Sequence, residues 1–94
     1  MKITYEINIL KDNKEVIATG RLTNHCIHNI DVKKKYRRKG FATFIINQLI
    51  SNGGTWLWVR KNNKKAIKLY KKLGFKEQNC GNKWYRMERE LNET

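Results

Sequence analysis

The first third of the 94-residue chain alternates apolar and polar residues with the period of two that is typical of half-buried strands. In the segment ITYEINIL (3–10), one face would carry Ile3, Tyr5, Ile7 and Ile9. The polar stretch KDNK (11–14) indicates a turn, and EVIATGRL (15–22) follows as the returning strand of a hairpin. A third strand is expected over CIHNIDV (26–32).

The pattern then changes to that of helices. GFATFIINQLISN (40–52) is apolar around most of its circumference and stops at a pair of glycines, so it predicts a largely buried helix. TWLWVR (55–60) is expected to form a short buried strand, and a second helix is predicted over about 62–73. Lysines occupy the outer face of this helix, and its predicted buried stripe follows the i, i+3, i+4, i+7 spacing. The stripe consists of Ala66, Leu69, Tyr70 and Leu73.

The last segments, FKEQ (75–78) and KWYRMERE (83–90), predict a closing hairpin joined by the turn NCGN. The expected order is therefore βββ-α-β-α-ββ. This order predicts a single mixed α/β domain over residues 1–94, with helices packed on a mixed, mostly antiparallel sheet.

Charge changes the picture most. The chain has 21 lysines and arginines against 8 acidic residues, for a formal net charge of +13. Such an excess predicts an anionic partner, which could be nucleic acid, an acidic protein face or a polyphosphate cofactor. The basic residues concentrate in two segments, with six in residues 33–39 and eight in residues 60–76. An anion is expected to meet these two segments.

Several other classes of protein are disfavoured. No apolar run is long enough to span a membrane, and the alternating N-terminus differs from the continuous apolar core of a signal peptide. A cytoplasmic protein without membrane contact is therefore expected. Cys26 and Cys80 match no metal-binding spacing, which predicts two reduced thiols and no metal site. Cys26 also lacks an evident activating partner that would make it an acyl-carrying nucleophile.

The basic segment KKKYRRKGFA (33–42) lies between the third strand and the first helix. Taken alone, it is typical of a solvated charge run or a localisation signal. Its flanks favour phosphate binding, because the first amides of a helix have no internal partners and the helix dipole places positive potential there. Gly40 at the helix entrance lets the backbone approach a ligand closely. Strand, basic loop, glycine and helix together predict a pyrophosphate site.

Two motifs resemble those of the GNAT superfamily of N-acetyltransferases. The first is Arg37-x-x-Gly40-x-Ala42 after a strand ending in valine, which is similar to the acetyl-CoA loop of that family. The second is VRKNNKKAIKLYKKLGFKE (59–77), whose matching positions are Asn63, Ala66, Leu69, Tyr70, Gly74 and Phe75. The resemblance covers about residues 24–89 and implies the GNAT fold, in a short form without the usual first strand and the two helices after it.

The resemblance implies an acetyl-CoA site. Backbone amides of residues 38–42 would bind the pyrophosphate, and the pantetheine arm would pair with the edge of the third strand at Ile30 and Val32. Asn63 would bond the cofactor arm, although its position also suits a helix N-cap. The implied cofactor-binding residues are Ile30, Val32, Arg37, Arg38, Lys39, Gly40, Phe41, Ala42, Asn63 and Tyr70.

The implied general acid is Tyr70, which the family places near the cofactor sulfur; helix spacing alone would suit an amphipathic core tyrosine. The base is less defined, because Trp58 stands where relatives that modify protein N-termini usually have a glutamate. His28 is the leading side chain, since an imidazole changes charge nearest neutral pH. It could equally be a strand histidine without a catalytic role. Asp31, Glu6 and a water relay are the alternatives.

The function predicted is acetyl transfer from acetyl-CoA to a primary amine by direct attack in a ternary complex. The amine could belong to a protein N-terminus, a lysine or a small molecule, and the basic surface hints at an acidic carrier. The alternative is a non-catalytic binding module of the same fold that uses its basic surface on nucleic acid or an acidic protein. Trp56 and Trp58 are expected in the core or in the wall of the acceptor site, more than on a stacking platform. The oligomeric state is not predicted.

Overall fold

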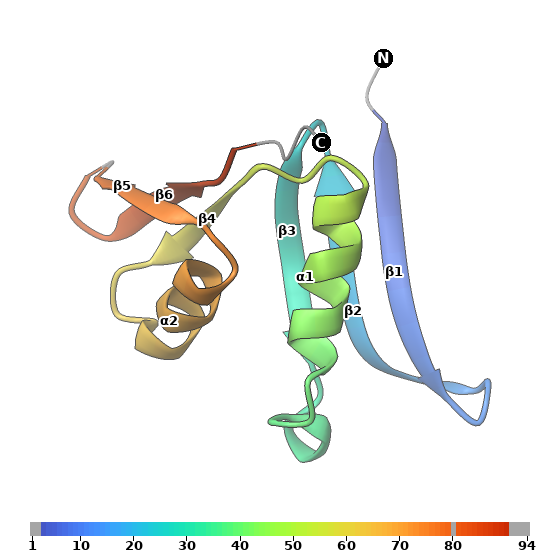
Figure 1. The fold of residues 1–94 in the computed structure, drawn as a ribbon. Helices are drawn as coiled ribbons and strands as arrows, with labels where there is room; N and C mark the ends of the chain where they lie inside the picture. The colour runs from blue at the N-terminus through green and yellow to red at the C-terminus, as the bar shows by residue number, and fades with distance from the viewer. Residues whose placement is uncertain (1–2, 80, 91–94) are drawn as a thin grey trace. The chain divides into compact units, whose positions relative to one another are not determined.

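The computed structural model describes residues 3–79 and 81–90, and within them it has six strands and two α-helices (Figure 1). The predicted order βββ-α-β-α-ββ is confirmed. Cys80 and the thiol predicted there lie outside the described residues. The chain forms two compact units, residues 1–54 and residues 55–94.

The first unit is an antiparallel three-stranded meander with one α-helix packed on β2 and β3 (Figure 1). Its elements are β1 (Thr4–Lys11), β2 (Glu15–Thr23), β3 (Cys26–Val32), a short 3-10 helix (Lys34–Tyr36) and α1 (Phe41–Ser51). Apolar side chains of β2 and β3 alternate toward α1 and form the core together with the inner face of that helix. The most buried are Ile17, Ala18, Leu22, Ile27, Ile45, Ile46 and Leu49.

The turn between β1 and β2 has the chemistry that its sequence predicts. Asp12 and Asn13 both have positive φ, 53° and 57°, and the Lys14 amide donates to the Lys11 carbonyl at 3.0 Å. Two consecutive positive φ values define the turn whose twist matches paired strands. The apolar face predicted for β1 is only partly buried, because Ile7 and Ile9 are half-buried whereas Ile3 and Tyr5 are exposed.

The contact between α1 and β2 depends on a glycine. A Cβ atom on Gly20 would lie 2.5 Å from Ile45 Cγ2 and 2.7 Å from Ile30 Cδ1. Ile45 belongs to α1 and Ile30 to β3, so the added atom could be accommodated only by shifting these apolar side chains. We therefore expect Gly20→Val to destabilise the protein by about 1–3 kcal/mol or more. Urea unfolding would measure the loss; an unchanged midpoint would show that α1 can lift from the sheet at no cost.

The second unit has β6 at the centre of an antiparallel sheet, paired with β4 on one side and β5 on the other (Figure 1). Its elements are β4 (Trp56–Arg60), α2 (Lys64–Lys72), β5 (Lys76–Asn79) and β6 (Trp84–Glu88). The buried side chains come from β4, β6, α2 and the residue that precedes β5, and they are Leu57, Val59, Met87, Ile67 and Phe75.

Three details differ from the prediction for this unit. The helix starts at Lys64 and not at 62, because residues 61–62 form a turn in which the Asn63 amide donates to the Arg60 carbonyl. The fully buried residue of α2 is Ile67, and the four predicted stripe residues are half-buried around it. The strand β4 is buried on one face only, so Trp58, at 45% exposure, is not a core residue.

Candidate functional site

The basic loop after β3 is fixed to the first unit at three points. The Lys33 amide donates to the Ile17 carbonyl at 2.8 Å, and Lys33 Nζ lies 3.0 Å from Glu15 Oε2. The Arg37 side chain folds back, with Nε donating to the Val32 carbonyl at 2.9 Å. Arg37 thus ties the loop to the end of β3 through Nε. The other two guanidinium nitrogens remain for a ligand.

Tyr36 anchors the middle of this loop. Its ring has Lys35 Nζ at 5.4 Å and Lys11 Nζ at 5.8 Å from the centroid, distances that allow cation–π attraction. The tyrosine side chain raises the pKa of Lys11. The hydroxyl of Tyr36 is buried. The sequence reading did not single out this residue; its one signal was an aromatic side chain inside a run of lysines and arginines.

The entrance to α1 has a run of available backbone donors. Arg38 and Gly40 have positive φ, 63° and 86°, and the first helical bond runs from the Phe44 amide to the Gly40 carbonyl at 3.0 Å. Across residues 3–79 and 81–90, no acceptor is hydrogen-bonded to the amides from Arg38 to Thr43. No acidic residue stands in the first turn of the helix.

The space in front of these amides is open. A Cβ atom placed on Gly40 would meet no atom within 4 Å. Unpaired amides, the positive end of a helix and three exposed cations nearby make a site suited to a polyphosphate group. The cations belong to Arg37, Arg38 and Lys39. The residues present fit the pyrophosphate of a coenzyme A derivative, and the pyrophosphate loop stays a prediction.

The strand β3 contains an irregularity that the sequence reading missed. Asn29 has a φ of 54°, and the pairing with β2 shifts between Thr19 and Arg21. An extra residue of this kind forms a bulge, which bends a strand and leaves backbone groups unpaired. Asparagine tolerates left-handed backbone conformations better than most residues, so an asparagine in the middle of a predicted strand was the sequence signal for this bulge. Ile30 follows the bulge and packs toward Gly20, while the buried Val32 has its carbonyl bonded to Arg37.

His28 is half-buried on β3, and its Nε2 shares a hydrogen bond of 2.9 Å with Thr23 Oγ1. It is in register with Arg21, which is in turn in register with Glu6. Of the alternative bases, Glu6 is paired with Arg21 at 3.4 Å and Asp31 is exposed. Cys26 is half-buried at the start of the same strand.

On α2, Asn63 is the N-cap: its Oδ1 accepts a hydrogen bond of 3.2 Å from the Ala66 amide. The capping role that its position suggested is therefore confirmed. The cap uses one lone pair of the oxygen, so the second lone pair and the two hydrogens on Nδ2 remain for a ligand.

Tyr70 lies about two turns further along this helix and packs edge-to-face on Phe75, with ring centroids 5.9 Å apart. Burial raises the pKa of the Tyr70 phenol above its ordinary value of 10.0. The hydroxyl therefore keeps its proton throughout the neutral range, as a proton donor must.

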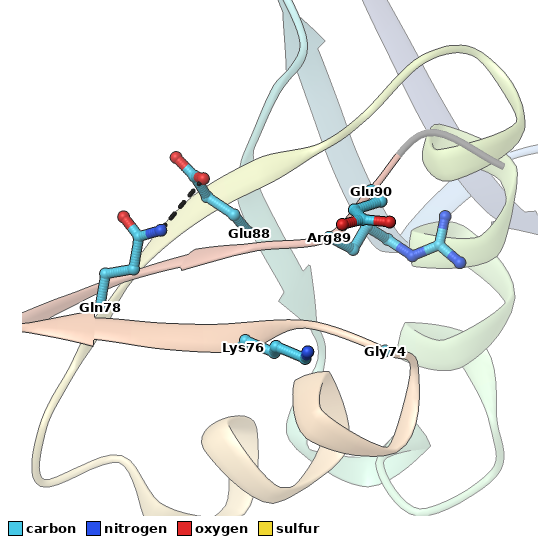
Figure 2. A pocket seen from close by; sticks show the side chains of 6 residues that line it. All are labelled: Gly74, Lys76, Gln78, Glu88, Arg89 and Glu90. Carbon is cyan, nitrogen blue, oxygen red and sulfur yellow. Dashed lines mark hydrogen bonds between the residues drawn. The ribbon is translucent and has the colours of Figure 1, made fainter.

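Loop residues 37–42 belong to the first unit together with Val32, Ile30 and His28, whereas Asn63 and Tyr70 belong to the second. A hollow of about 440 Å³ in the second unit contains none of the predicted site residues. Figure 2 shows its lining, which carries both charge signs and includes a hydrogen bond from Gln78 Nε2 to Glu88 Oε2. The residues drawn are Gly74, Lys76, Gln78, Glu88, Arg89 and Glu90. The coenzyme interpretation therefore depends on the backbone donors of the loop and not on this cavity.

A mixed α/β chain with unpaired amides and cations where a basic loop enters a helix is of the class that suits phosphate-containing ligands, and comparison with known proteins gives the family. The Acetyltransferase (GNAT) domain family matches residues 4–77. The chain belongs to the GNAT acetyltransferase family, and the family and fold class predicted from the sequence are confirmed.

Among curated proteins, an uncharacterized N-acetyltransferase of Methanocaldococcus jannaschii is 39% identical over 67 residues, which is 65% of this chain and 30% of that protein. The chain thus spans less than a third of the length of this relative. Among solved structures, the PaiA N-acetyltransferase of Thermoplasma acidophilum, in complex with coenzyme A, superposes with a TM-score of 0.77 at 18% identity. The match covers 92% of this chain and 60% of that one.

The ribosomal-protein-S18-alanine N-acetyltransferase of Escherichia coli superposes with a TM-score of 0.76 at 22% identity, covering 97% of this chain and 71% of that one. Likenesses at this identity describe the fold. Within the described residues, neither helix has the length and apolar character needed to cross a bilayer.

Proposed function

We propose that this chain is an acetyl-CoA-dependent N-acetyltransferase that acetylates a primary amine by direct attack in a ternary complex. The observation that carries the proposal is the run of unpaired amides from Arg38 to Thr43 in front of an open Gly40, in a chain of the GNAT family. When bound, acetyl-CoA would supply an activated acyl thioester. The chain itself has to hold the cofactor, orient the amine and move two protons.

The loop would hold the cofactor by its phosphates. Amides of residues 38–42, Phe41 and Ala42 among them, would donate to the pyrophosphate oxygens, while Arg37, Arg38 and Lys39 would add attraction from the solvent side. Backbone groups of Ile30 and Val32, beside the bulge at Asn29, would pair with the pantetheine arm. Asn63 would donate to the same arm through Nδ2.

Tyr70 would act as the general acid. The amine nitrogen forms a bond to the acyl carbon, the carbon–sulfur bond breaks with its electrons leaving on sulfur, and the Tyr70 hydroxyl protonates that sulfur. At reference pKa values for a phenol and a thiol, this transfer is uphill by about 2 kcal/mol. Burial makes the step somewhat harder, but the cost stays small beside the barrier of a typical enzymatic reaction.

His28 would accept the proton that the attacking amine releases, with Thr23 fixing the orientation of the ring. The demand on this base depends on the acceptor. Deprotonating a lysine ammonium at pH 7 costs about 4.6 kcal/mol, against about 1 kcal/mol for an α-amine. A weak base therefore suits an N-terminal amine or a small amine of low pKa.

We expect acetyl-CoA to raise the melting temperature and phosphate-free acetyl-pantetheine to do so much less, because the phosphates meet the loop. At a concentration of one hundred times Kd the stabilisation is about 2.7 kcal/mol, which corresponds to roughly 10–20 °C for a domain of this size. Added salt should reduce the shift, since the cationic partners are exposed.

Differential scanning fluorimetry measures the shift, and release of free thiol against a panel of peptides and amines measures transfer. No shift at millimolar acetyl-CoA would contradict the proposal. A shift without thiol release from any amine would instead favour the non-catalytic binding module.

A further inference from the structure

One face of the second unit carries all three tryptophans of the chain. In the β4–β6 register, Trp56 is opposite Glu88, Trp58 is opposite Arg86, and Arg60 is opposite Trp84. The β5–β6 register adds Lys76 opposite Glu88 and Gln78 opposite Arg86. Directly opposed residues share a face of a sheet. We call this set of eight residues the tryptophan face.

The tryptophan face is the side of the sheet away from the core. The residues that alternate with it, Leu57, Val59 and Met87, are buried. Trp58 and Trp84 are 45% and 40% exposed, which is unusual for the largest apolar side chain. Of the two placements predicted for Trp58, the core is therefore wrong.

Cations are interleaved with the indoles. The guanidinium carbon of Arg86 lies 4.0 Å from the centroid of the Trp56 ring, and that of Arg60 lies 4.9 Å from the Trp84 ring. Trp56 also meets Trp58 edge-to-face, with centroids 6.0 Å apart. The stacked neighbours hold the indoles in place, so binding a ligand would cost little side-chain entropy.

The face is positive as well as aromatic. Its one carboxylate, Glu88, is bonded by both Arg86 and Gln78, the second contact being visible in Figure 2. Arg60 therefore has no acidic neighbour on the face itself, and Lys76 is opposite Glu88, whose carboxylate already accepts from Arg86 and Gln78, in a chain of net charge +13.

We propose that the tryptophan face binds single-stranded nucleic acid, separately from the acetyl-CoA site. Bases would stack on Trp58 and Trp84, and phosphates would meet Arg60 and Lys76. Base stacking on aromatic side chains beside cations is how single strands are held without sequence readout. An acidic peptide would use the cations but has no planar group for two exposed indoles, so the nucleic acid fits the face better.

The unmodified protein offers a direct test, because every indole of the chain is on this face. We expect an oligothymidine of about 12 nucleotides to quench the tryptophan fluorescence and to bind more weakly as salt rises. Trp58→Ala and Trp84→Ala should each weaken binding of the fluorescein-labelled oligonucleotide by about 5- to 150-fold, the effect of losing one stacked base. Trp58→Leu, which keeps an apolar but non-planar side chain, should lose as much.

Two variants that each remove one positive charge distinguish binding at the tryptophan face from a general effect of the chain's positive charge. Arg60→Gln should weaken binding more than Lys68→Gln, which removes the same charge from the outer face of α2. Equal losses in this pair, with no effect of Trp58→Ala, would overturn the proposal, as would displacement of the oligonucleotide by acetyl-CoA. Binding of polyglutamate but not of oligothymidine would instead assign the face to an acidic protein. Circular dichroism confirms that each variant is folded.

Discussion

Tyr70→Phe is expected to lower turnover by about 10²–10⁴-fold while leaving acetyl-CoA affinity almost unchanged. Phenylalanine keeps the ring against Phe75, so α2 should pack as before and only the hydroxyl is lost. Positioned acid–base groups typically contribute a factor of this size, which is roughly 3–5 kcal/mol of barrier. A loss confined to the rate would identify an interaction made in the transition state.

The measurement is thiol release under saturating acetyl-CoA, with affinity taken from calorimetry. Tyr5→Phe is the matched control, because it removes the hydroxyl of an exposed tyrosine at the edge strand of the first unit. If Tyr70→Phe turns over at the wild-type rate when chemistry is rate-limiting, Tyr70 is a packing residue and the acid is elsewhere.

Gly40→Val should weaken acetyl-CoA binding by about 10²–10⁴-fold in a protein that still folds. The valine side chain would enter the open space in front of the amides, where the pyrophosphate is proposed to lie. Losing two hydrogen bonds to a charged group, at about 1.5–3 kcal/mol each, gives a change of this order. The positive φ of 86° adds backbone strain of about 1–3 kcal/mol, less than the stability of a typical domain.

Gly81→Val controls for that strain. Gly81 has a φ of 110° and also faces open space, but it lies in the turn between β5 and β6. Both variants should lose similar stability in urea unfolding, and only Gly40→Val should lose affinity. Equal acetyl-CoA affinity in the two would show that this loop is not the phosphate site.

Features set by near neighbours in the chain could be predicted from the sequence. Apolar residues recur every two positions in strands and about every 3.6 positions in helices. These periods predict the order of the elements, because the side chains on one face of a strand or helix are the ones that pack against a neighbouring element. The family motif was recognisable for the same reason. The Asn63 side chain caps α2 by accepting a hydrogen bond from the Ala66 amide, three residues later, and Gly40 is the N-cap residue of α1. These are local contacts between residues close in sequence.

The remaining features depend on residues far apart in the chain. Trp58 has the hydrophobicity of a core residue, but only the other face of its strand is buried, so it is exposed. Ile67 is the most buried residue of α2 because packing against the rest of the unit, and not spacing along the chain alone, decides which side of a short helix faces inward. The bulge at Asn29 exists only in register with β2, and the availability of the loop amides depends on Lys33 and Arg37 reaching back to the strands. Sequence thus determined the elements and their caps, whereas tertiary packing decided which faces are buried and which backbone groups remain unpaired.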